Sequence, residues 1–574
     1  MKKFLSMIMC LLLALTPVMM IGCGDGTGEE GGNEISIPEA DPEKTNLYVE
    51  VKSGGTGYKW LVDAGARFSA LKENEVYEAG TKGIIVHAKT SENPSINNAE
   101  SSNSAIIDVM GQPNIESAAR EGRILPIDDV LTTVNDMREG APISPLDKIP
   151  QEQRSRYIYN GQYYAGPSCE YYPVVSYDKN LFDSKYFYLA RPEAQDNTDL
   201  TVHSSGILGQ DFYFLSEATG NDASLKSCGP DGEYNTDDDG LPSSLYEYIA
   251  LCEYIKSFGY YPLNFTGSFS YYSNFLMTAL YTSLQGYEGA RNNYDFNGQS
   301  EIVTGYTNET LFGLNNVYVP TTKVVDITEA NGYLTTHEVE KYYAEAFMQL
   351  CIEENWFATI KEDQKAAMNR FVVGSKETIA MHIDGSYWYN EATDANCFED
   401  WKILNDLTGF EERDVRVMSL PINISESVQA GEGKVQALLD MNYGIFVINS
   451  NIKDNEGLLR AAKEFLAFLY TDAELSAYTA STSILRSMDY PLSSKDADRI
   501  SIYGEKLLSA VNSGRSRIVY FASNSAKFNS SPATFQQSWT NSVFAVGGIP
   551  CLYDALHAYG KTVSECFEAQ KLSW

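Results

Sequence analysis

The sequence has few basic side chains for its length. The 574 residues include only 43 lysines and arginines but 77 aspartates and glutamates, which gives a formal net charge of −34 at pH 7. Such a surface repels phosphate backbones and anionic lipid headgroups. The composition therefore argues against nucleic-acid binding, and against membrane attachment through surface charge.

Histidines and paired cysteines are also scarce. The five histidines (His87, His203, His337, His382 and His557) show no HExxH or HxH spacing, and no G-x-S-x-G motif is present. The seven cysteines after Cys23 form no CxxC pair. The sequence thus lacks the residue motifs of zinc hydrolases and serine hydrolases. It also shows neither a zinc knuckle nor a disulfide framework.

Long apolar runs are confined to the N-terminus. Lys2 and Lys3 precede an apolar stretch that ends at Gly22 and Cys23, which predicts a secretory signal over residues 1–22. Residues 20–23 (MIGC) resemble a bacterial lipobox, in which the cysteine receives a lipid. Residues 23–46 are mostly glycine, acidic and small polar residues, typical of a flexible tether. We expect lipidated Cys23 to hold the protein at the outer face of the cell membrane; an ordinary signal with an incidental cysteine is the alternative.

The folded part opens with an α/β pattern. Short apolar strands are predicted at residues 47–51, 83–86 and 105–110, with a helix from about Tyr58 after the first. Strand, helix, strand predicts a parallel sheet, whose ligands lie beyond the carboxyl ends of its strands. The glycine loop 54–57 and the loop 111–114 are therefore candidate walls of a site.

Two further helices are indicated downstream. Thr335 and Glu338 show a capping-box spacing before a helix that runs to about Glu354. Apolar residues between 458 and 469 share one face of another helix. These elements also favour an α/β class.

Four motifs occur in an order that resembles one family. Residues 160–167 (NGQYYAGP) and 176–182 (SYDKNLF) are similar to the "dGkyYalP … lvYNkdlF" signature of the extracellular solute-binding proteins of ABC importers, family 1, the carbohydrate-binding group. Residues 374–381 with 384–388 (DGSYW) resemble its "GkaAM … GSWW", and residues 461–466 with 471–474 resemble its "aAkeFl" segment. The resemblance covers nearly the whole chain after the signal.

The resemblance implies a periplasmic-binding-protein-like type II fold, with two α/β lobes, a hinge and an interlobe cleft. Lobe 1, the N-lobe, would comprise residues 47–167 and 448–490. Lobe 2, the C-lobe, would comprise residues 168–447 and 491–574, with insertions near 185–240 and 285–330. The chain would cross near Pro167, again near 444–449, and a third time after Tyr490.

The same resemblance implies the function. The protein would be a monomer that captures a carbohydrate by hinge closure, performs no catalysis, and delivers its ligand to the transmembrane subunits of an ABC permease. Two other functions stay open. One is an extracellular glycoside hydrolase, because 77 acidic residues can supply the two carboxylates it needs. The other is a surface glycan-binding adhesin that takes no part in transport.

A sugar presents apolar C–H faces and a rim of hydroxyls, so its site needs aromatic rings, carboxylates and donors. Trp388 is the favoured stacking residue because it falls in the "GSWW" motif, with core packing as the alternative. Glu170 and Tyr171 follow the first crossing. The expected ligand-binding residues are Tyr58, Glu170, Tyr171, Tyr271, Tyr272, Trp388, Arg486 and Trp539.

One acidic loop suggests a metal. Oxygen-bearing side chains alternate in it at Asp231, Glu233, Asn235, Asp237 and Asp239. The spacing is EF-hand-like, but the twelfth position is Tyr246, and Glu247 is better explained as the capping partner of Ser244. We expect a structural Ca²⁺ here and no other cofactor; a solvated acidic turn is the alternative.

Overall fold

The computed structural model describes residues 37–97, 102–111, 113–358, 361–374, 377–407, 413–521, 525–531 and 543–574. The expected signal, Cys23, most of the tether and Trp539 lie outside these ranges. Within them, no helix combines the length and the apolar character that a bilayer crossing requires.

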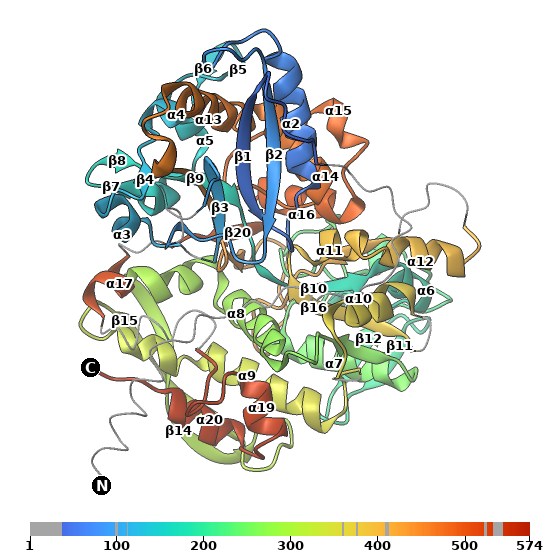
Figure 1. The fold of residues 1–574 in the computed structure, drawn as a ribbon. Helices are drawn as coiled ribbons and strands as arrows, with labels where there is room; N and C mark the ends of the chain where they lie inside the picture. Colours follow the sequence, from blue (N-terminus) through green and yellow to red (C-terminus); the bar gives the residue numbers. More distant parts are fainter. Residues whose placement is uncertain are drawn as a thin grey trace.

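The N-lobe is built on one mixed sheet (Figure 1). Its strands are β1 (Thr45–Lys52), β2 (Ile84–Ser91), β3 (Ile106–Met110), β19 (Gly444–Asn449) and β4 (Ile124–Leu125), in the order β2-β1-β3-β19-β4, with β9 (Gly166–Cys169) also paired to β19. β1 runs parallel to β2 and β3, as the sequence predicts, whereas β19 is antiparallel to its neighbours. A late strand thus returns to the first sheet.

Helices cover this sheet, and the longest of them carries an apolar stripe at helical spacing. α13 (Glu456–Leu469) buries Ala461, Ala462, Phe465, Leu466 and Leu469, which confirms the predicted helix. The other N-lobe helices are α2 (Lys59–Leu71), α3 (Ile115–Arg120), α4 (Asp128–Thr132), α5 (Pro145–Lys148) and α14 (Asp472–Thr482). Two small hairpins, β5 (Asp136–Arg138) with β6 (Ala141–Ile143) and β7 (Ile158–Tyr159) with β8 (Gln162–Tyr163), complete the lobe.

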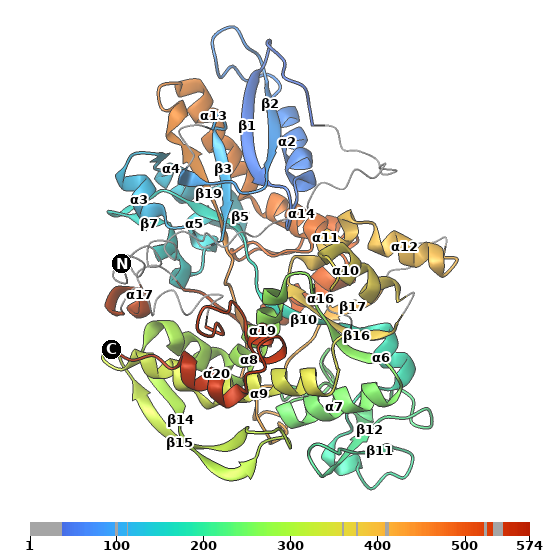
Figure 2. The same ribbon diagram turned by 60° about the horizontal axis from the view of Figure 1, so that its bottom comes forward.

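The C-lobe has a second, separate sheet (Figures 1 and 2). Its strands follow the order β13 (Tyr261–Asn264), β16 (Ile379–Gly385), β10 (Pro173–Asp178) and β17 (Val415–Val417). The other C-lobe strand pairs are β18 (Gln436–Leu439) with β20 (Ser516–Val519), β11 (Thr201–Ser204) with β12 (Asp211–Phe214), and β14 (Gly298–Thr310) with β15 (Tyr318–Ile327).

The C-lobe is rich in helices. They are α6 (Lys179–Lys185), α7 (Leu245–Ser257), α8 (Ser273–Asp295), α9 (Val339–Glu353), α10 (Gln364–Val373), α11 (Trp388–Asp394), α12 (Cys397–Leu404), α16 (Ile502–Asn512), α17 (Ala526–Ser530), α19 (Leu552–His557) and α20 (Val563–Gln570). Ser244 and Glu247 form the predicted capping box at the start of α7. The second predicted box does not form: Glu338 is buried, and its carboxylate instead accepts hydrogen bonds from Tyr281 and Gln285.

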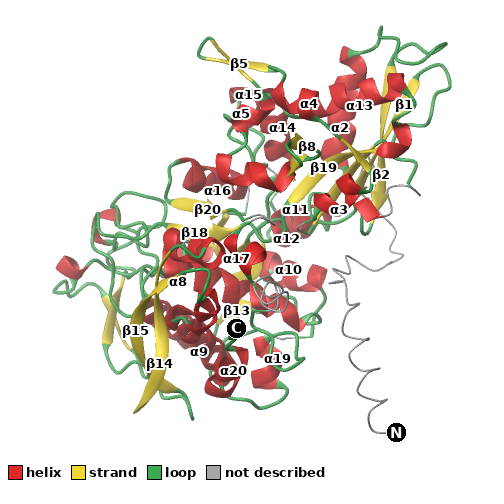
Figure 3. Cartoon of the chain, turned by 90° about the vertical axis from the view of Figure 1, so that its left-hand side faces the viewer, coloured by secondary structure: helices red, strands yellow, loops and turns green. Residues whose placement is uncertain are grey.

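The chain passes between the lobes three times. It leaves the N-lobe sheet between β9 and β10, and it returns between β18 and β19. The third passage comes before α16, later than residue 491, because Ser493 and the short helix α15 (Ser494–Ala497) still bond to α14 through Ser476. Each lobe encloses its own apolar core. The predicted class, two α/β lobes joined by crossing segments, is confirmed, and Figure 3 shows the two bodies side on.

Candidate ligand site between the lobes

Two loops bring the N-lobe to the lobe boundary. The glycine loop, residues 54–57, follows the carboxyl end of β1, and Gly111 follows Met110, the last residue of β3. Gly55 and Gly57 have φ of 72° and 61°, a region that side chains disfavour. As predicted, the glycine loop and Gly111 lie at the carboxyl ends of parallel strands.

Tyr171, the second residue after β9, lies directly against the glycine loop. Its hydroxyl accepts a hydrogen bond of 3.0 Å from the backbone N–H of Thr56. A Cβ on Gly55 would lie 2.8 Å from that hydroxyl oxygen, so only glycine allows this approach. The ring makes an edge contact with Tyr387, with centroids 4.8 Å apart. Tyr171 thus joins the crossing segment to both lobes.

Tyr271 and Tyr272 lie in a 3-10 turn before α8, with ring centroids 5.3 Å apart. Burial, and then the negative charge of Asp384, raise the pKa of both hydroxyls. The Tyr272 side chain lies close to that of Tyr387. The structure therefore brings Tyr171, Tyr271, Tyr272 and Tyr387 together as one group, which we call the interlobe tyrosine cluster. Tyr171 and Tyr387 are 2% and 5% exposed and the other two are half-buried, so a ligand could reach Tyr171 and Tyr387 only if the lobes part.

Trp388 does not join this cluster, which corrects the prediction that it stacks on a ligand. The ring is 0% exposed, and its indole N–H donates to Ser176 at 2.8 Å. Phe371, His382, Tyr389 and Tyr503 surround it. A ring enclosed in this way has no face free for a sugar. Its neighbour Tyr387 points to the lobe boundary instead, because Trp388 begins α11 and a helix turns successive side chains away from one another.

A buried histidine and a buried aspartate face each other near the tyrosines. The Asn264 amide donates to the Ala367 carbonyl, so its oxygen accepts the bond of 2.6 Å from His382 Nδ1. His382 Nε2 lies 3.6 Å from Asp384 Oδ2, and both side chains are 0% exposed. At this distance Nε2 and Oδ2 do not form a hydrogen bond, and neither atom has another partner among the described residues. Burial raises the pKa of Asp384, and His382 partly offsets that rise.

Glu170 is enclosed in the hinge, which corrects its expected role as an acceptor for ligand hydroxyls. It is 2% exposed, and its two carboxylate oxygens accept from the Tyr172 hydroxyl at 3.0 Å and the Tyr520 hydroxyl at 2.6 Å. Burial, and then the charge of Asp440, raise the pKa of Glu170 to about 7.

Asp440 is the buried partner of Arg156. The ion pair is 2.6 Å long, both side chains are 0% exposed, and the guanidinium lies 3.8 Å from the Tyr443 ring centroid. Arg156 also donates to the carbonyl of Phe521, and Asp440 accepts from the backbone N–H of Tyr171. This network ties an N-lobe arginine to the first and second crossings.

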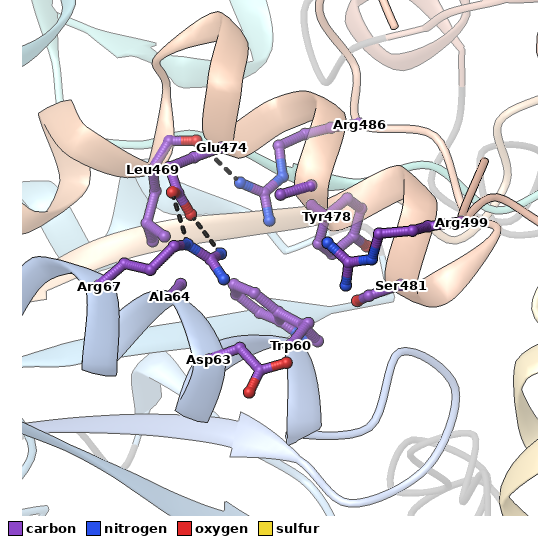
Figure 4. Close-up of a pocket in the computed structure, with 11 residues that line it drawn as sticks. Trp60, Asp63, Ala64, Arg67, Leu469, Glu474, Tyr478, Ser481, Arg486 and Arg499 are labelled. Atoms are coloured by element: carbon purple, nitrogen blue, oxygen red, sulfur yellow. Dashed lines mark hydrogen bonds and ion pairs between the residues drawn. The ribbon is translucent and has the colours of Figure 1, made fainter. Parts of the chain in front are cut away.

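Arg486 ties β9 to the end of α13 inside the N-lobe and does not face the tyrosine cluster, a further correction. Its guanidinium donates to the carbonyls of Ser168 and Leu469 and lies 4.0 Å from the Tyr478 ring centroid. It lines a small cavity of about 10 Å³ beside Trp60 and the Arg67–Glu474 ion pair (Figure 4). Because it is 1% exposed, it is neither a ligand fork nor a surface ion pair.

The acidic loop does not gather its five expected metal ligands. Asp237 faces three cations, Arg416, Lys506 and Arg515, at 3.4 to 3.6 Å. Asp231 and Asp239 accept hydrogen bonds from backbone N–H groups of the loop, and Glu233 and Asn235 are exposed. Among the described residues, no three His, Cys, Asp or Glu side chains are placed to hold one ion. The set does not fit the expected Ca²⁺, and we derive no role for a metal.

Of the other predicted residues, Tyr58 is half-buried directly before α2, beside the glycine loop. Trp539 and Cys23 lie outside the described residues. The sequence reasoning missed Tyr387, Asn390 and Glu391. A signal for them exists: residues 387, 390, 391 and 394 have the spacing of one helix face, opposite the face that Trp388 and Ala392 bury.

A scan against models of protein families finds no match, and no curated protein matches the chain. Among solved structures, a chitin oligosaccharide binding protein aligns over 92% of this chain and 97% of its own, with 13% identity and a TM-score of 0.50. The raffinose complex of the solute-binding protein RafE (10% identity) covers 92% and 99% with a TM-score of 0.49. A structure described for xylan utilization by Caldanaerobius polysaccharolyticus (13% identity) gives the same coverages and TM-score. At these identities the first likeness establishes the fold, and the other two add no argument.

Proposed function

We propose that this protein is the substrate-binding lipoprotein of an ABC importer, which captures an oligosaccharide between its lobes and delivers it unaltered to a permease. The observation that carries the proposal is the interlobe tyrosine cluster. Tyr171 contacts the loop after β1 and Met110 at the end of β3, and it lies against Tyr387, with Tyr271 and Tyr272 nearby. Aromatic rings with hydroxyls suit both the C–H faces and the hydroxyl rim of a sugar.

The two-lobed fold supports the same proposal. Three crossing segments allow one lobe to rotate on the other, and contacts that a ligand makes with both lobes favour closure. The fold is shared with a chitin oligosaccharide binding protein, so oligosaccharides of that kind are the first ligands to test.

Isothermal titration calorimetry against a panel of neutral oligosaccharides, chitin oligosaccharides included, tests the capture step. We expect stoichiometric binding of at least one sugar. Chromatography of the sugar after incubation should show no product; cleavage would make the protein a glycoside hydrolase. Binding to immobilised polysaccharide with no soluble oligosaccharide bound would make it an adhesin.

The cellular part of the proposal places the monomer at the outer face of the cell membrane, held by a lipid on Cys23. Mass spectrometry of the mature N-terminus checks this anchor, because a diacylglyceryl group adds a large defined mass to Cys23. An unmodified Cys23, or a mature chain beginning elsewhere, would remove the anchor from the proposal.

A further inference from the structure

One face of α11 rests on the N-lobe. Helical spacing places Asn390, Glu391 and Asp394 on the same side as Tyr387, the residue that contacts Tyr171. Figures 1 and 2 both show α11 at the lobe boundary, beneath the N-lobe. The opposite side of the helix buries Trp388 and Ala392 in the C-lobe core, so the C-lobe fixes the orientation of this face.

The contacts of this face are specific and polar. The backbone N–H of Gly55 donates to Glu391 Oε1 at 2.7 Å, and the Asn390 amide donates to the Gly55 carbonyl at 2.7 Å. Both backbone groups of one N-lobe residue are therefore satisfied by neighbouring side chains of one C-lobe helix. Gln364, at the start of α10, donates to the second oxygen of Glu391 and holds the carboxylate in place.

The glycine loop is shaped to receive α11. A Cβ on Gly54 would lie 3.3 Å from Glu391 Oε1, and a Cβ on Gly57 would lie 3.3 Å from Asp394 Oδ2. Both distances are tighter than ordinary contacts, and Gly57 also has a positive φ. The glycines thus permit the close approach of a helix from the other lobe, and this approach explains why the loop is rich in glycine.

These contacts differ from those in the crossing segments. Gly55 and Glu391 lie 336 residues apart in the sequence, and neither belongs to a crossing. The first crossing lies nearby, because Tyr171 contacts both Thr56 and Tyr387, but the chain does not cross between Gly55 and α11. A rotation that separates α11 from the glycine loop would break these contacts, so we expect them only where the lobes meet as they do in this structure.

From this geometry we infer that Glu391 and Asn390 form an interlobe latch, which grips Gly55 and favours the closed arrangement of the lobes in the absence of any ligand. The latch itself is independent of what the protein binds. Its consequence for affinity rests on the proposed function: a ligand that binds the closed form has an apparent Kd equal to its intrinsic Kd divided by the closed fraction.

The test measures lobe separation without ligand. Spin labels on Glu73→Cys in the N-lobe and Glu217→Cys in the C-lobe report the distance by double electron–electron resonance, in a Cys23→Ser background. The seven cysteines that the structure describes are buried and should not take label. We expect the unsubstituted latch to give a predominantly short distance. Glu391→Ala should lower the short-distance population about tenfold relative to the long one, and Glu391→Gln, which keeps an acceptor oxygen, should lower it less.

The matched control is Glu399→Ala, which removes an exposed glutamate from the next helix and should leave the distances unchanged. Asn390→Ala provides a second test if Glu391→Ala does not fold, as judged by circular dichroism. The latch is overturned if the ligand-free protein shows mainly the long distance, or if the folded latch variants keep the wild-type distribution. Because no sugar is present, these results stand whatever the ligand panel shows.

Discussion

The two lobes are joined in two chemically different ways. At the hinge, Arg156 and Asp440 form an ion pair that is 0% exposed, with Glu170 and tyrosine hydroxyls beside it. At α11, the contacts are made by Asn390 and Glu391, which are half-buried, and by an ion pair of Lys59 and Asp394 that is largely open to solvent. Water does not reach the Arg156–Asp440 pair, because it is buried among the crossing segments. The polar groups of α11 can bind water again when the lobes part.

This difference in burial predicts that the hinge contacts affect stability, whereas the α11 contacts affect lobe movement. A buried charge that loses its partner has no water to replace it, whereas an exposed polar group regains its hydrogen bonds from solvent. Substitutions at the hinge and in the C-lobe core should therefore change the free energy of unfolding. Substitutions at the latch should mainly change the balance between open and closed forms.

The two neighbours Tyr387 and Trp388 give the sharpest contrast. Trp388→Ala removes a fully buried ring and should lower the free energy of unfolding by about 4 kcal/mol. Tyr387→Phe keeps the ring and removes one hydroxyl, at a cost of about 1 kcal/mol or less. Urea denaturation checks both. Equal losses would show that the two faces of α11 are not distinct.

Breaking the hinge ion pair should cost nearly as much. Arg156→Ala leaves the Asp440 carboxylate buried without its partner, so we expect a loss of about 3 kcal/mol in the free energy of unfolding. The double variant with Asp440→Asn should recover part of that loss, because no unpaired charge remains. A double-mutant cycle by urea denaturation measures the coupling; a coupling near zero would contradict the assigned role of the pair.

The order of the elements could be predicted from the sequence, but the direction of single side chains could not. The first three strands follow from apolar runs, and the parallel pairing from the helix between them. Tyr171, Tyr271 and Tyr272 reach the boundary as expected because loops that follow strands and crossings carry them there. Trp388 and Glu170 do not. Which way Trp388 points depends on where α11 begins, and the burial of Glu170 depends on Tyr172 and Tyr520, the latter 350 residues away.

Glu170 makes the free energy of unfolding depend on pH, because its pKa differs between the folded and unfolded protein. Its pKa is raised to about 7 in the folded protein from an ordinary value of 4.5, so the folded hinge favours the protonated acid. Its contribution to stability is full below about pH 4.5 and is lost as pH rises through about 7. Across pH 5 to 7 the wild type should thus lose more stability than Glu170→Gln, by up to about 1 kcal/mol per pH unit. Parallel denaturation curves for the two proteins would contradict this placement of the proton.

The smallest effect is expected at the outer end of α11. Lys59 and Asp394 approach to 2.7 Å, yet their side chains are 50% and 39% exposed, and such pairs contribute about 0 to 1 kcal/mol. Asp394→Asn should leave the urea midpoint almost unchanged and shift the ligand-free lobe distances far less than Glu391→Ala does. If Asp394→Asn opened the lobes as fully as Glu391→Ala, long-range charge attraction would hold α11 on the glycine loop. The effect should then fade as salt is raised. A response to Glu391→Ala that persists in high salt would instead locate the grip in the short hydrogen bonds to Gly55, which salt screens little.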